Sequence, residues 1–444
     1  MLPLTLREVA AAIDGTLVCG ALQAVSESTQ IGRVCTDTRQ MHPDSLFIAL
    51  KGETFDAHDH LDDAIAGGAV AAMVDHGAPS IPHVRVANTR LAMGRLANHV
   101  RRRFGETKVI AVAGSNGKTG TKHLIHSVLA TRLRGTMSPK SFNNDVGVPL
   151  TLFDVEPGHD YVIVEIGTNH PGEVRHLSLM CEPDIAIITS IGEEHLEFFK
   201  DLHGVRRENA DIAAGVRGGG RIFVIGDDSH LRTLLPTTST FGFDPTNDLV
   251  ARDVRTTLEG TSFVAGTPFM VPQIGRHNAS NALAAIAVGR AMGLSDDDIR
   301  TGLASATAPE MRMQKRTIGP VTIINDAYNA NPTSVRAALT TLAEIDWPGR
   351  KIVVLGEMRE LGDTAAAAHH TIADLAKSLL LGQLVFVGDA FAFTASNVPD
   401  SWYSHADAAC AFADCIRPGD LILIKASRSI RLEKVEAAIA ARFA

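Results

Sequence analysis

The chain has 444 residues and a formal net charge of −8, so it lacks the basic excess of a general nucleic-acid-binding or membrane-surface protein. Its length predicts about two to four domains. Only 5% of the residues are aromatic and glycine is common, which favours α/β domains whose sheets are covered by helices.

The five cysteines form no C-x-x-C pair and no metal-binding spacing. Their odd number predicts free thiols in a reducing compartment. No apolar run approaches the roughly 18 residues of a membrane helix, and the first residues lack the pattern of an export signal. We therefore expect a cytoplasmic protein, a monomer, with no membrane insertion and no nucleic-acid partner.

Residues 5–103 predict a small α/β domain. Thr5 to Glu8 fits a helix capping box, 46–50 fits an apolar strand, and 67–74 fits a turn followed by a strand. A helix over 89–103 links to the next domain, and its basic end, 101–103, is typical of a solvated helix end. Several polar residues can bind an anionic group or can equally belong to solvated loops: Asp37, Thr38, Arg39, Lys51 and His58.

A glycine-rich turn lies between an apolar strand, 109–112, and an amphipathic helix that begins near Lys118. This context is the one that a phosphate-binding loop requires, because glycines let the backbone approach an anion and the helix start offers free N–H groups. Lys118 can reach the β- and γ-phosphates of a nucleotide, and the Thr119 hydroxyl can hold Mg²⁺. Val112 occupies the first glycine position of the strict motif, so a glycine turn with a chance Lys-Thr pair is the alternative.

Polar residues follow the next predicted strands. Glu165 ends the strand 161–164, where a Mg²⁺ ligand is expected, and His195 follows the strand 184–189. His195 is a candidate metal ligand or proton carrier, against the alternative of an ordinary lone histidine. The segment 141–149 is too polar and turn-rich for a regular element. Its Asn143 and Asn144 can order a nucleotide or a metal-bound water, or can belong to an ordinary turn.

A helix is predicted to start within 274–281 and run through Ala291. Asn278 at its start can contact a base or sugar, or can be only a cap. The pattern restarts after Glu310 with strands at 321–324, 351–355, 384–387 and 420–424, and a helix over 335–345. Polar clusters follow three of these strands, so one rim of a doubly wound sheet carries most of the reactive side chains.

We therefore predict three α/β domains: a first domain over 1–104, a central phosphate-loop ATPase-like domain with a parallel sheet over 105–311, and a C-terminal Rossmann-like domain over 312–444. A phosphate loop opposite a second polar rim predicts a composite cleft for ATP and further substrates.

The chain resembles the Mur ligase family from end to end. The resemblance is carried by these motifs: Asp37-Thr38-Arg39, Gly114-Ser115-Asn116-Gly117-Lys118-Thr119, Asn143-Asn144-x-x-Gly147-Val148-Pro149, Glu165-x-Gly167-x-Asn169, His195-Leu196-Glu197, His277-Asn278-x-x-Asn281-Ala282-Leu283 and Lys425-x-Ser427-Arg428-Ser429. The stretches 326–334 and 355–362 resemble the family member that adds D-alanyl-D-alanine. The Asp-Asn-Pro-Arg stretch typical of the diaminopimelate- or lysine-adding member is absent.

The resemblance implies an amide ligase that uses ATP and Mg²⁺ to join D-alanyl-D-alanine to UDP-N-acetylmuramoyl-tripeptide through an acyl phosphate. It implies catalytic roles for Lys118, Glu165 and His195, with Thr119, Glu165 and His195 as metal ligands. The implied ATP-binding residues are Gly114, Ser115, Asn116, Gly117, Lys118, Thr119, Gly120, Asn278, Arg312 and Asp326. The implied substrate-binding residues are Asp37, Thr38, Arg39, Asn143, Asn144, Asn329, Ser427 and Arg428.

The sequence departs from the family's pattern at two positions: Gly120 replaces the usual hydroxyl residue after Thr119, and Asn209 replaces a lysine. Many relatives carry a lysine, carbamylated and supporting the second Mg²⁺, where this chain has Asn209. A carbamate cannot form on asparagine, so Asn209 or Glu208 supplies an oxygen directly, or the second metal is held differently. The alternatives to this function are another ligase of the same architecture, such as folylpolyglutamate synthase, and a phosphate-loop protein that binds ATP as a switch.

Overall fold

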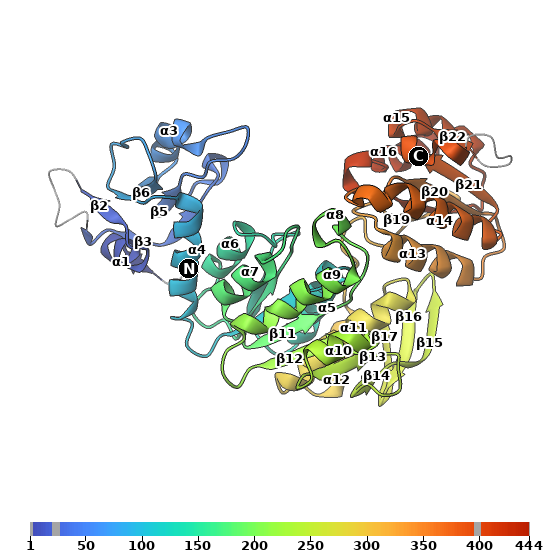
Figure 1. Ribbon diagram of the computed structural model, residues 1–444, viewed down its shortest axis with the longest axis horizontal. Coiled ribbons are helices and arrows are strands. Elements are labelled where there is room, and N and C mark those ends of the chain that lie inside the picture. The colour runs from blue at the N-terminus through green and yellow to red at the C-terminus, as the bar shows by residue number, and fades with distance from the viewer. Residues whose placement is uncertain (1–2, 20–26, 395–400, 444) are drawn as a thin grey trace.

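The computed structural model describes residues 3–19, 27–394 and 401–443. Three units, each with its own main sheet, follow one another along the chain and form an open arc (Figure 1). The N-terminal and C-terminal units stand at opposite ends of the central unit. The concave side of this arc carries a cleft that is lined by residues of all three units.

The N-terminal unit is built on a five-stranded sheet of order β2-β7-β6-β5-β4, in which only the edge strand β2 is antiparallel to its neighbour. Its elements are β1 (Leu4–Thr5), α1 (Leu6–Ala12), β2 (Thr16–Val18), β3 (Gln30–Ile31), β4 (Arg33–Cys35), η2 (Thr38–Gln40), β5 (Ser45–Ile48), η3 (Ala57–His60), α3 (Leu61–Ala66), β6 (Ala69–Val74), β7 (His83–Arg85) and α4 (Thr89–Arg101). The predicted capping box is present, since Glu8 N donates to Thr5 Oγ1 at 3.2 Å and Thr5 N donates to Glu8 Oε2 at 2.6 Å.

Helix α4 joins this unit to the central unit, and here one prediction was wrong. Arg101 is not part of a solvated helix end: its side chain is 1% exposed and donates to Cys181 O at 2.9 Å and Asp184 Oδ2 at 2.7 Å. Arg102 remains exposed and pairs with Glu182 at 2.7 Å. Sequence patterning misses this because a basic triplet has no periodicity that marks one member as buried.

The central unit has a seven-stranded, all-parallel sheet of order β14-β13-β12-β11-β8-β10-β9. Its elements are β8 (Lys108–Ala113), α5 (Lys118–Leu129), β9 (Gly135–Met137), α6 (Gly147–Phe153), β10 (Tyr161–Glu165), α7 (Glu173–Cys181), β11 (Ile185–Ile188), α8 (Leu196–Phe199), α9 (Leu202–Ala210), η4 (Asp211–Gly215), β12 (Arg221–Ile225), α10 (Ser229–Leu234), β13 (Ser239–Gly242) and β14 (Leu249–Val250). The segment 141–149, predicted to lack regular structure, contains the first turn of α6.

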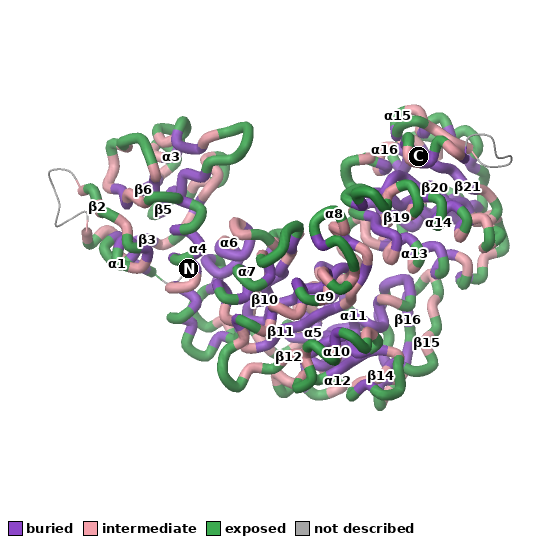
Figure 2. Tube along the Cα trace, in the orientation of Figure 1, coloured by how far each residue is buried: buried purple, intermediate pink, exposed green. Residues whose placement is uncertain are grey.

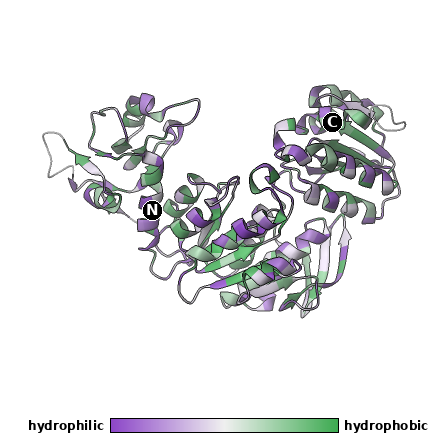
Figure 3. Ribbon diagram, in the orientation of Figure 1, coloured by the Kyte–Doolittle hydropathy of each residue, from purple (hydrophilic) through white to green (hydrophobic). Residues whose placement is uncertain are grey.

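Strand β8 lies in the middle of this sheet, between β10 and β11. The strand order changes direction at β8, and ligands bind outside the carboxyl ends of strands at such a switch point. The inner strands β8, β10 and β11 are buried and mostly apolar because helices cover both faces, as Figure 2 shows by burial and Figure 3 by hydropathy.

A three-stranded antiparallel sheet and two helices complete the central unit: β15 (Arg252–Thr257), β16 (Gly260–Ala265), β17 (Thr267–Val271), α11 (Arg276–Ala291) and α12 (Asp296–Ala304). Helix α11 packs along α5 and ends before Gly293, as predicted. The antiparallel sheet was not predicted.

The C-terminal unit has a six-stranded mixed sheet of order β18-β19-β23-β20-β21-β22, with β18 as its antiparallel edge. Its elements are β18 (Gln314–Ile318), β19 (Val321–Asp326), α13 (Pro332–Glu344), β20 (Lys351–Gly356), η5 (Gly362–Thr364), α14 (Ala365–Ser378), β21 (Gln383–Val387), η6 (Asp389–Thr394), β22 (Ser401–Tyr403), α15 (Ala406–Ala409), η7 (Cys410–Cys415), β23 (Leu421–Lys425), η8 (Arg428–Ile430) and α16 (Glu433–Phe443). Strands β19, β23 and β20 are neighbours, so their polar carboxyl ends meet on one rim.

Candidate active site

The loop between β8 and α5 has the backbone that a phosphate loop needs. Gly114 and Gly117 have φ values of 128° and 85°, in the region that side chains disfavour. A Cβ on Gly114 would lie 2.2 Å from Thr189 Oγ1, and one on Gly117 would lie 2.5 Å from Asn281 Oδ1. Both positions therefore favour glycine by conformation, and Gly114 also by space, because the backbone N of Thr189 lies 2.9 Å from that Cβ position.

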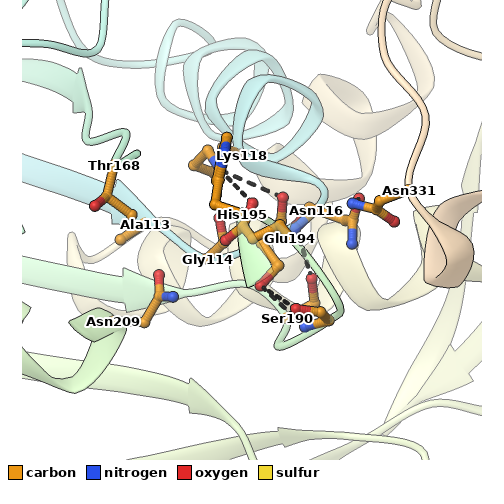
Figure 4. Close-up of polar contacts among 12 residues, drawn as sticks. Ala113, Gly114, Asn116, Lys118, Thr168, Ser190, Glu194, His195, Asn209 and Asn331 are labelled. Atoms are coloured by element: carbon orange, nitrogen blue, oxygen red, sulfur yellow. Dashed lines mark hydrogen bonds and ion pairs between the residues drawn. The ribbon is translucent and has the colours of Figure 1, made fainter. Parts of the chain in front are cut away.

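Lys118 is the first residue of α5, and its ammonium folds back over the loop (Figure 4). Its Nζ donates to the carbonyl oxygen of Gly114 and, at 3.3 Å, to that of Ser115. Glu194 Oε2 lies 3.8 Å from the same nitrogen. The cation is thus held at the mouth of the loop, where it can meet an anion bound by the loop N–H groups.

Glu165, at the end of β10, is the centre of a buried polar cluster. Thr119 Oγ1 lies 3.2 and 3.1 Å from its two carboxylate oxygens, and Asn143 Nδ2 donates to it at 3.2 Å. Lys122 Nζ lies 2.9 Å from Glu165 Oε2, with both side chains at most 1% exposed. Burial lowers the pKa of Lys122, and the facing carboxylate opposes that shift.

Hydroxyl, carboxylate and amide oxygens are the donors that Mg²⁺ prefers. Thr119 and Glu165 supply a hydroxyl and a carboxylate within one cluster, which fits Mg²⁺, while Asn143 turns its Nδ2 toward Glu165. His195 Nδ1 lies 2.7 Å from Glu360 Oε2, and such a carboxylate partner leaves the other ring nitrogen, Nε2, for a metal ion.

That His195–Glu360 contact crosses between the central and C-terminal units. Two further contacts cross the same junction: Asn331 Nδ2 donates to Asn116 Oδ1 at 2.9 Å, and Glu193 N donates to Thr333 Oγ1 at 3.3 Å. The pKa of Glu360 is lowered, chiefly by its hydrogen bond with His195. The phosphate loop therefore faces the start of α13 directly.

The carboxyl ends of β19 and β23, in the C-terminal unit, carry a second cluster of polar side chains. Asp326 and Lys425 are register partners on β19 and β23, and Lys425 Nζ lies 2.6 Å from Asp326 Oδ2. The same Nζ donates to Asn329 O at 3.1 Å. The guanidinium of Arg312 lies 4.1 Å from the ring centroid of Tyr328, which holds the cation over the rim.

Asn278 lies in the first turn of α11, whose cap is Gly275, so the interpretation of Asn278 as a helix cap is wrong. Its Nδ2 donates to Ile274 O at 2.9 Å, and its Oδ1 accepts from Asn281 Nδ2 at 3.0 Å. Burial lowers the pKa of the neighbouring His277.

A cleft of about 1260 Å³ joins these groups. It collects most of the residues predicted from sequence: Ser115, Asn116, Gly117, Lys118, Thr119, Gly120, Asn143, Asn144, Glu165, His195, Asn278, Arg312, Asp326, Asn329 and Arg428. Gly114 lies in the loop behind the lining. Ser427 lies behind Arg428, where its Oγ accepts from Arg359 N at 3.0 Å and the side chain is buried.

The predicted N-terminal residues are not part of this cleft. Arg39 binds the Asp37 carboxylate through two hydrogen bonds of 2.8 Å, which lower the pKa of Asp37. Thr38 lies between these two residues in the sequence and is the first residue of the short helix η2. The N-terminal unit brings only Glu53 and Arg90 to the lining.

The structure also revises the expectation at the position of the family's lysine. Glu208 is occupied in holding the start of α7, because Thr168 Oγ1, Gly172 N and Val174 N all donate to it, at 3.1, 2.7 and 2.8 Å. Asn209 is 1% exposed, and its Nδ2 donates to Val205 O at 3.0 Å. Neither residue lines the cleft, so the proposed direct oxygen ligand from Glu208 is not supported.

Sequence reasoning missed several residues of the site: Lys122, Asn331, Thr333 and Glu360. Lys122 follows Lys118 by one helical turn and could have been found by that spacing. The other three meet the central unit only through the tertiary fold.

Fold and site together define a three-domain phosphate-loop protein with a composite cleft between its central and C-terminal units. Profiles of the Mur ligase middle domain, the glutamate ligase domain and the Mur ligase catalytic domain match residues 112–289, 311–428 and 30–101. The chain belongs to the Mur ligase family.

Among its relatives is the UDP-N-acetylmuramoyl-tripeptide–D-alanyl-D-alanine ligase of Bacillus subtilis, 35% identical over 98% of both chains. The enzyme of that name from Escherichia coli is 34% identical over 91% of this chain and 93% of its own. A MurF crystal structure from Acinetobacter baumannii superposes with a TM-score of 0.90 at 31% identity, over 99% of each chain. A MurF ligase structure from Thermotoga maritima, described as a complex with ADP, has a TM-score of 0.84 at 25% identity, over 93% of this chain and 97% of its own.

Proposed function

We propose that this protein is an ATP-dependent amide ligase that joins D-alanyl-D-alanine to UDP-N-acetylmuramoyl-tripeptide and releases ADP and phosphate. The observation that carries the proposal is the near full-length similarity to ligases of that name, combined with a phosphate loop that faces a polar rim. The product, a UDP-linked pentapeptide, is a peptidoglycan precursor.

In this proposal the β8–α5 loop binds the ATP phosphates through its N–H groups, and Lys118 neutralises their terminal charge. Thr119 and Glu165 hold Mg²⁺, which supplies charge neutralisation as the phosphoryl group is transferred. The donor set described above, with Asn143 beside Glu165, supports this assignment. His195 contributes to a second metal position through Nε2, with Glu360 orienting the ring from Nδ1.

On the C-terminal side, Asp326 contacts the ribose and Arg312 contacts the phosphates, while Asn278 approaches the adenine from α11. Arg428 holds the carboxylate of the incoming dipeptide, a task that suits a planar guanidinium, and Ser427 supports it from behind the cleft wall. Asn143, Asn144 and Asn329 contact the peptide substrate. The position of Asp326, Arg312 and Arg428 on the same cleft as Lys118 supports these roles.

Phosphoryl transfer to a carboxylate is mainly a matter of positioning and charge neutralisation. The tripeptide carboxylate attacks the γ-phosphorus and ADP leaves, which gives an acyl phosphate. The amine of D-alanyl-D-alanine then adds to the acyl carbon and loses a proton, and phosphate departs. Closing the cleft excludes the water that would hydrolyse the acyl phosphate.

Asp37, Thr38 and Arg39 bind the nucleotide end of the UDP-linked substrate, away from the cleft. The open arc then has to close, so that the peptide end reaches Lys118.

We place the domain boundaries at 104/105 and 311/312. ATP and a UDP-linked peptide are substrates of the cytoplasm, which supports a cytoplasmic enzyme, and we propose that it acts as a monomer. No helix in the described part of the chain has both the length and the apolarity to span a bilayer.

The test is phosphate release together with amide formation, measured with a panel of UDP-muramoyl peptides and candidate amines. We expect turnover only when UDP-N-acetylmuramoyl-tripeptide and D-alanyl-D-alanine are both present. ATP hydrolysis that needs neither acceptor nor amine would instead indicate a switch protein. Turnover with glutamate and a folate would indicate the folylpolyglutamate reaction.

A further inference from the structure

A second cluster of potential metal ligands lies in the N-terminal unit, outside the cleft. Asp56 and His58 belong to the loop and short helix η3 that follow β5, and Asp75 and His76 directly follow β6. Strands β5 and β6 are parallel neighbours, so the segments after their carboxyl ends meet. The two histidine rings stack with centroids 3.8 Å apart.

Both rings direct one nitrogen toward the same carboxylate. His58 Nδ1 lies 2.7 Å from Asp56 Oδ1, and His76 Nε2 lies 3.4 Å from Asp56 Oδ2. One ligand atom from each of these residues falls within 4.8 Å of the other two. With metal–ligand bonds of about 2.0–2.2 Å, neighbouring ligand atoms in a metal site lie roughly 3–3.5 Å apart, so the three residues are already near coordination distance.

The opposite nitrogens of both rings face a second carboxylate. Asp75 Oδ1 lies 3.3 Å from His58 Nε2 and 2.6 Å from His76 Nδ1. Metal-binding histidines commonly donate their other N–H to a carboxylate, which fixes the tautomer and the ring orientation. His76 has this arrangement with Asp75, whereas His58 Nε2 lies near the same carboxylate but accepts a hydrogen bond from Asp75 N at 3.2 Å.

The Asp56 carboxylate is positioned to bind a metal ion. The His58 backbone N–H and ring N–H both donate to Asp56 Oδ1, at 3.1 and 2.7 Å, and hold the carboxylate in place before the rings. Lys51 Nζ lies 3.3 Å from Asp56 Oδ2, but the lysine side chain is 67% exposed and can swing into solvent. His58 is buried while His76 is half exposed, which leaves an entry path from one side.

We propose that Asp56, His58 and His76 bind one first-row divalent metal ion such as Zn²⁺, with Asp75 orienting both histidines. Two imidazoles and one carboxylate favour such an ion over Mg²⁺. On binding, the His58 ring proton moves from Nδ1 to Nε2, so the ring exchanges the hydrogen bond it accepts from Asp75 N at 3.2 Å for one donated to Asp75 Oδ1. The ion links the segments after β5 and β6.

Isothermal titration of the full-length protein with Zn²⁺, without nucleotide, tests the proposal. We expect one equivalent to bind at this site, and Co²⁺ in its place to give visible absorption bands. His76→Gln and Asp56→Asn should each weaken binding at least tenfold, and Asp75→Asn should weaken it by about 10–100-fold. His76 is half exposed, so its variant should fold normally.

Two matched control variants test whether the ion binds at this cluster. His60→Gln changes another histidine of η3, which pairs with Asp63 at 3.0 Å, and should leave Zn²⁺ affinity unchanged. Glu165→Gln changes the proposed Mg²⁺ site and should leave this binding event unchanged. Absence of a Zn²⁺ equivalent in the wild-type protein, or equal affinity in His76→Gln and Asp56→Asn, would overturn the proposal.

Discussion

The ammonium of Lys122 lies 2.9 Å from the Glu165 carboxylate in a fully buried setting, one helical turn after Lys118. Lys122 Nζ also donates to Ser138 Oγ at 3.2 Å and to the Lys140 carbonyl. Ser138 Oγ in turn accepts from Glu165 N at 3.3 Å. Lys122 therefore fixes the carboxylate that we assign to Mg²⁺, although it does not line the cleft.

Lys122→Met should destabilise the protein strongly, because it leaves Glu165 buried without its cation. Removal of one partner of a buried ion pair costs about 3–5 kcal/mol, and denaturant unfolding measures this loss. The double variant Lys122→Met with Glu165→Gln should recover part of that free energy of unfolding. If the double variant is no more stable than the single one, the ion pair is not the cause.

Lys118→Ala should abolish ligation and leave the fold intact. The Lys118 ammonium contacts mainly carbonyl groups of its own loop, so its loss should change the melting temperature little. Amide formation and circular dichroism provide the two readouts. Lys108→Ala, at the exposed start of β8, is the matched control and should keep wild-type turnover. Wild-type turnover in Lys118→Ala would refute the phosphate-loop assignment.

The contact between His195 and Glu360 predicts a pH dependence of the junction between the central and C-terminal units. The pKa of Glu360 is lower in the folded protein than its ordinary value of 4.5. Its contribution to stability is therefore fully present above the unfolded pKa and is lost as pH falls through the lower, folded pKa. Glu360 is 56% exposed, so solvent screening limits the effect to less than about 1 kcal/mol.

Glu360→Gln tests this relationship. Thermal melts from pH 6 down to pH 3 should show the variant slightly less stable than the wild type near neutrality, with the difference vanishing at the acid end. Glu197→Gln, on the neighbouring α8, serves as a control that should show no such convergence. A difference that grows as the pH falls would contradict the assignment.

Activity should not depend on bicarbonate. Asn209 occupies the place where many relatives carry a carbamylated lysine, and asparagine cannot form a carbamate. We expect the same turnover in degassed, bicarbonate-free buffer as in buffer with added bicarbonate. Strong rescue by bicarbonate after decarboxylating treatment would mean that a lysine elsewhere is modified.

Elements that are marked by a short-range pattern in the sequence were predicted correctly. The parallel strands of the central sheet are continuous apolar runs, and the phosphate loop is marked by its glycines, so both were located correctly. Strands β15 to β17 were missed because β15 has only one apolar residue, Val254, and because the exposed Met270 of β17 is as apolar as its buried neighbours. Helix α13 begins three residues earlier than predicted, because Asn331 caps it and Pro332 opens it.

The contacts that sequence could not predict are those between the central and C-terminal units, because they depend on how these two units pack together. Asn116 and Asn331 are 215 positions apart, and no local pattern indicates that their amides meet. The same holds for His195 and Glu360. The buried state of Arg101 and Lys122 was likewise hidden, since a cation is assigned to solvent unless its partner is known.

The two glycines of the phosphate loop have a consequence for inhibition. Thr189 and Asn281 occupy the space into which any side chain at Gly114 or Gly117 would grow. Substitutions at Gly114 or Gly117 would therefore be a poor route to resistance against a compound that binds the backbone N–H groups of this loop. Resistance by substitution would have to arise at residues farther away, where the compound makes fewer contacts.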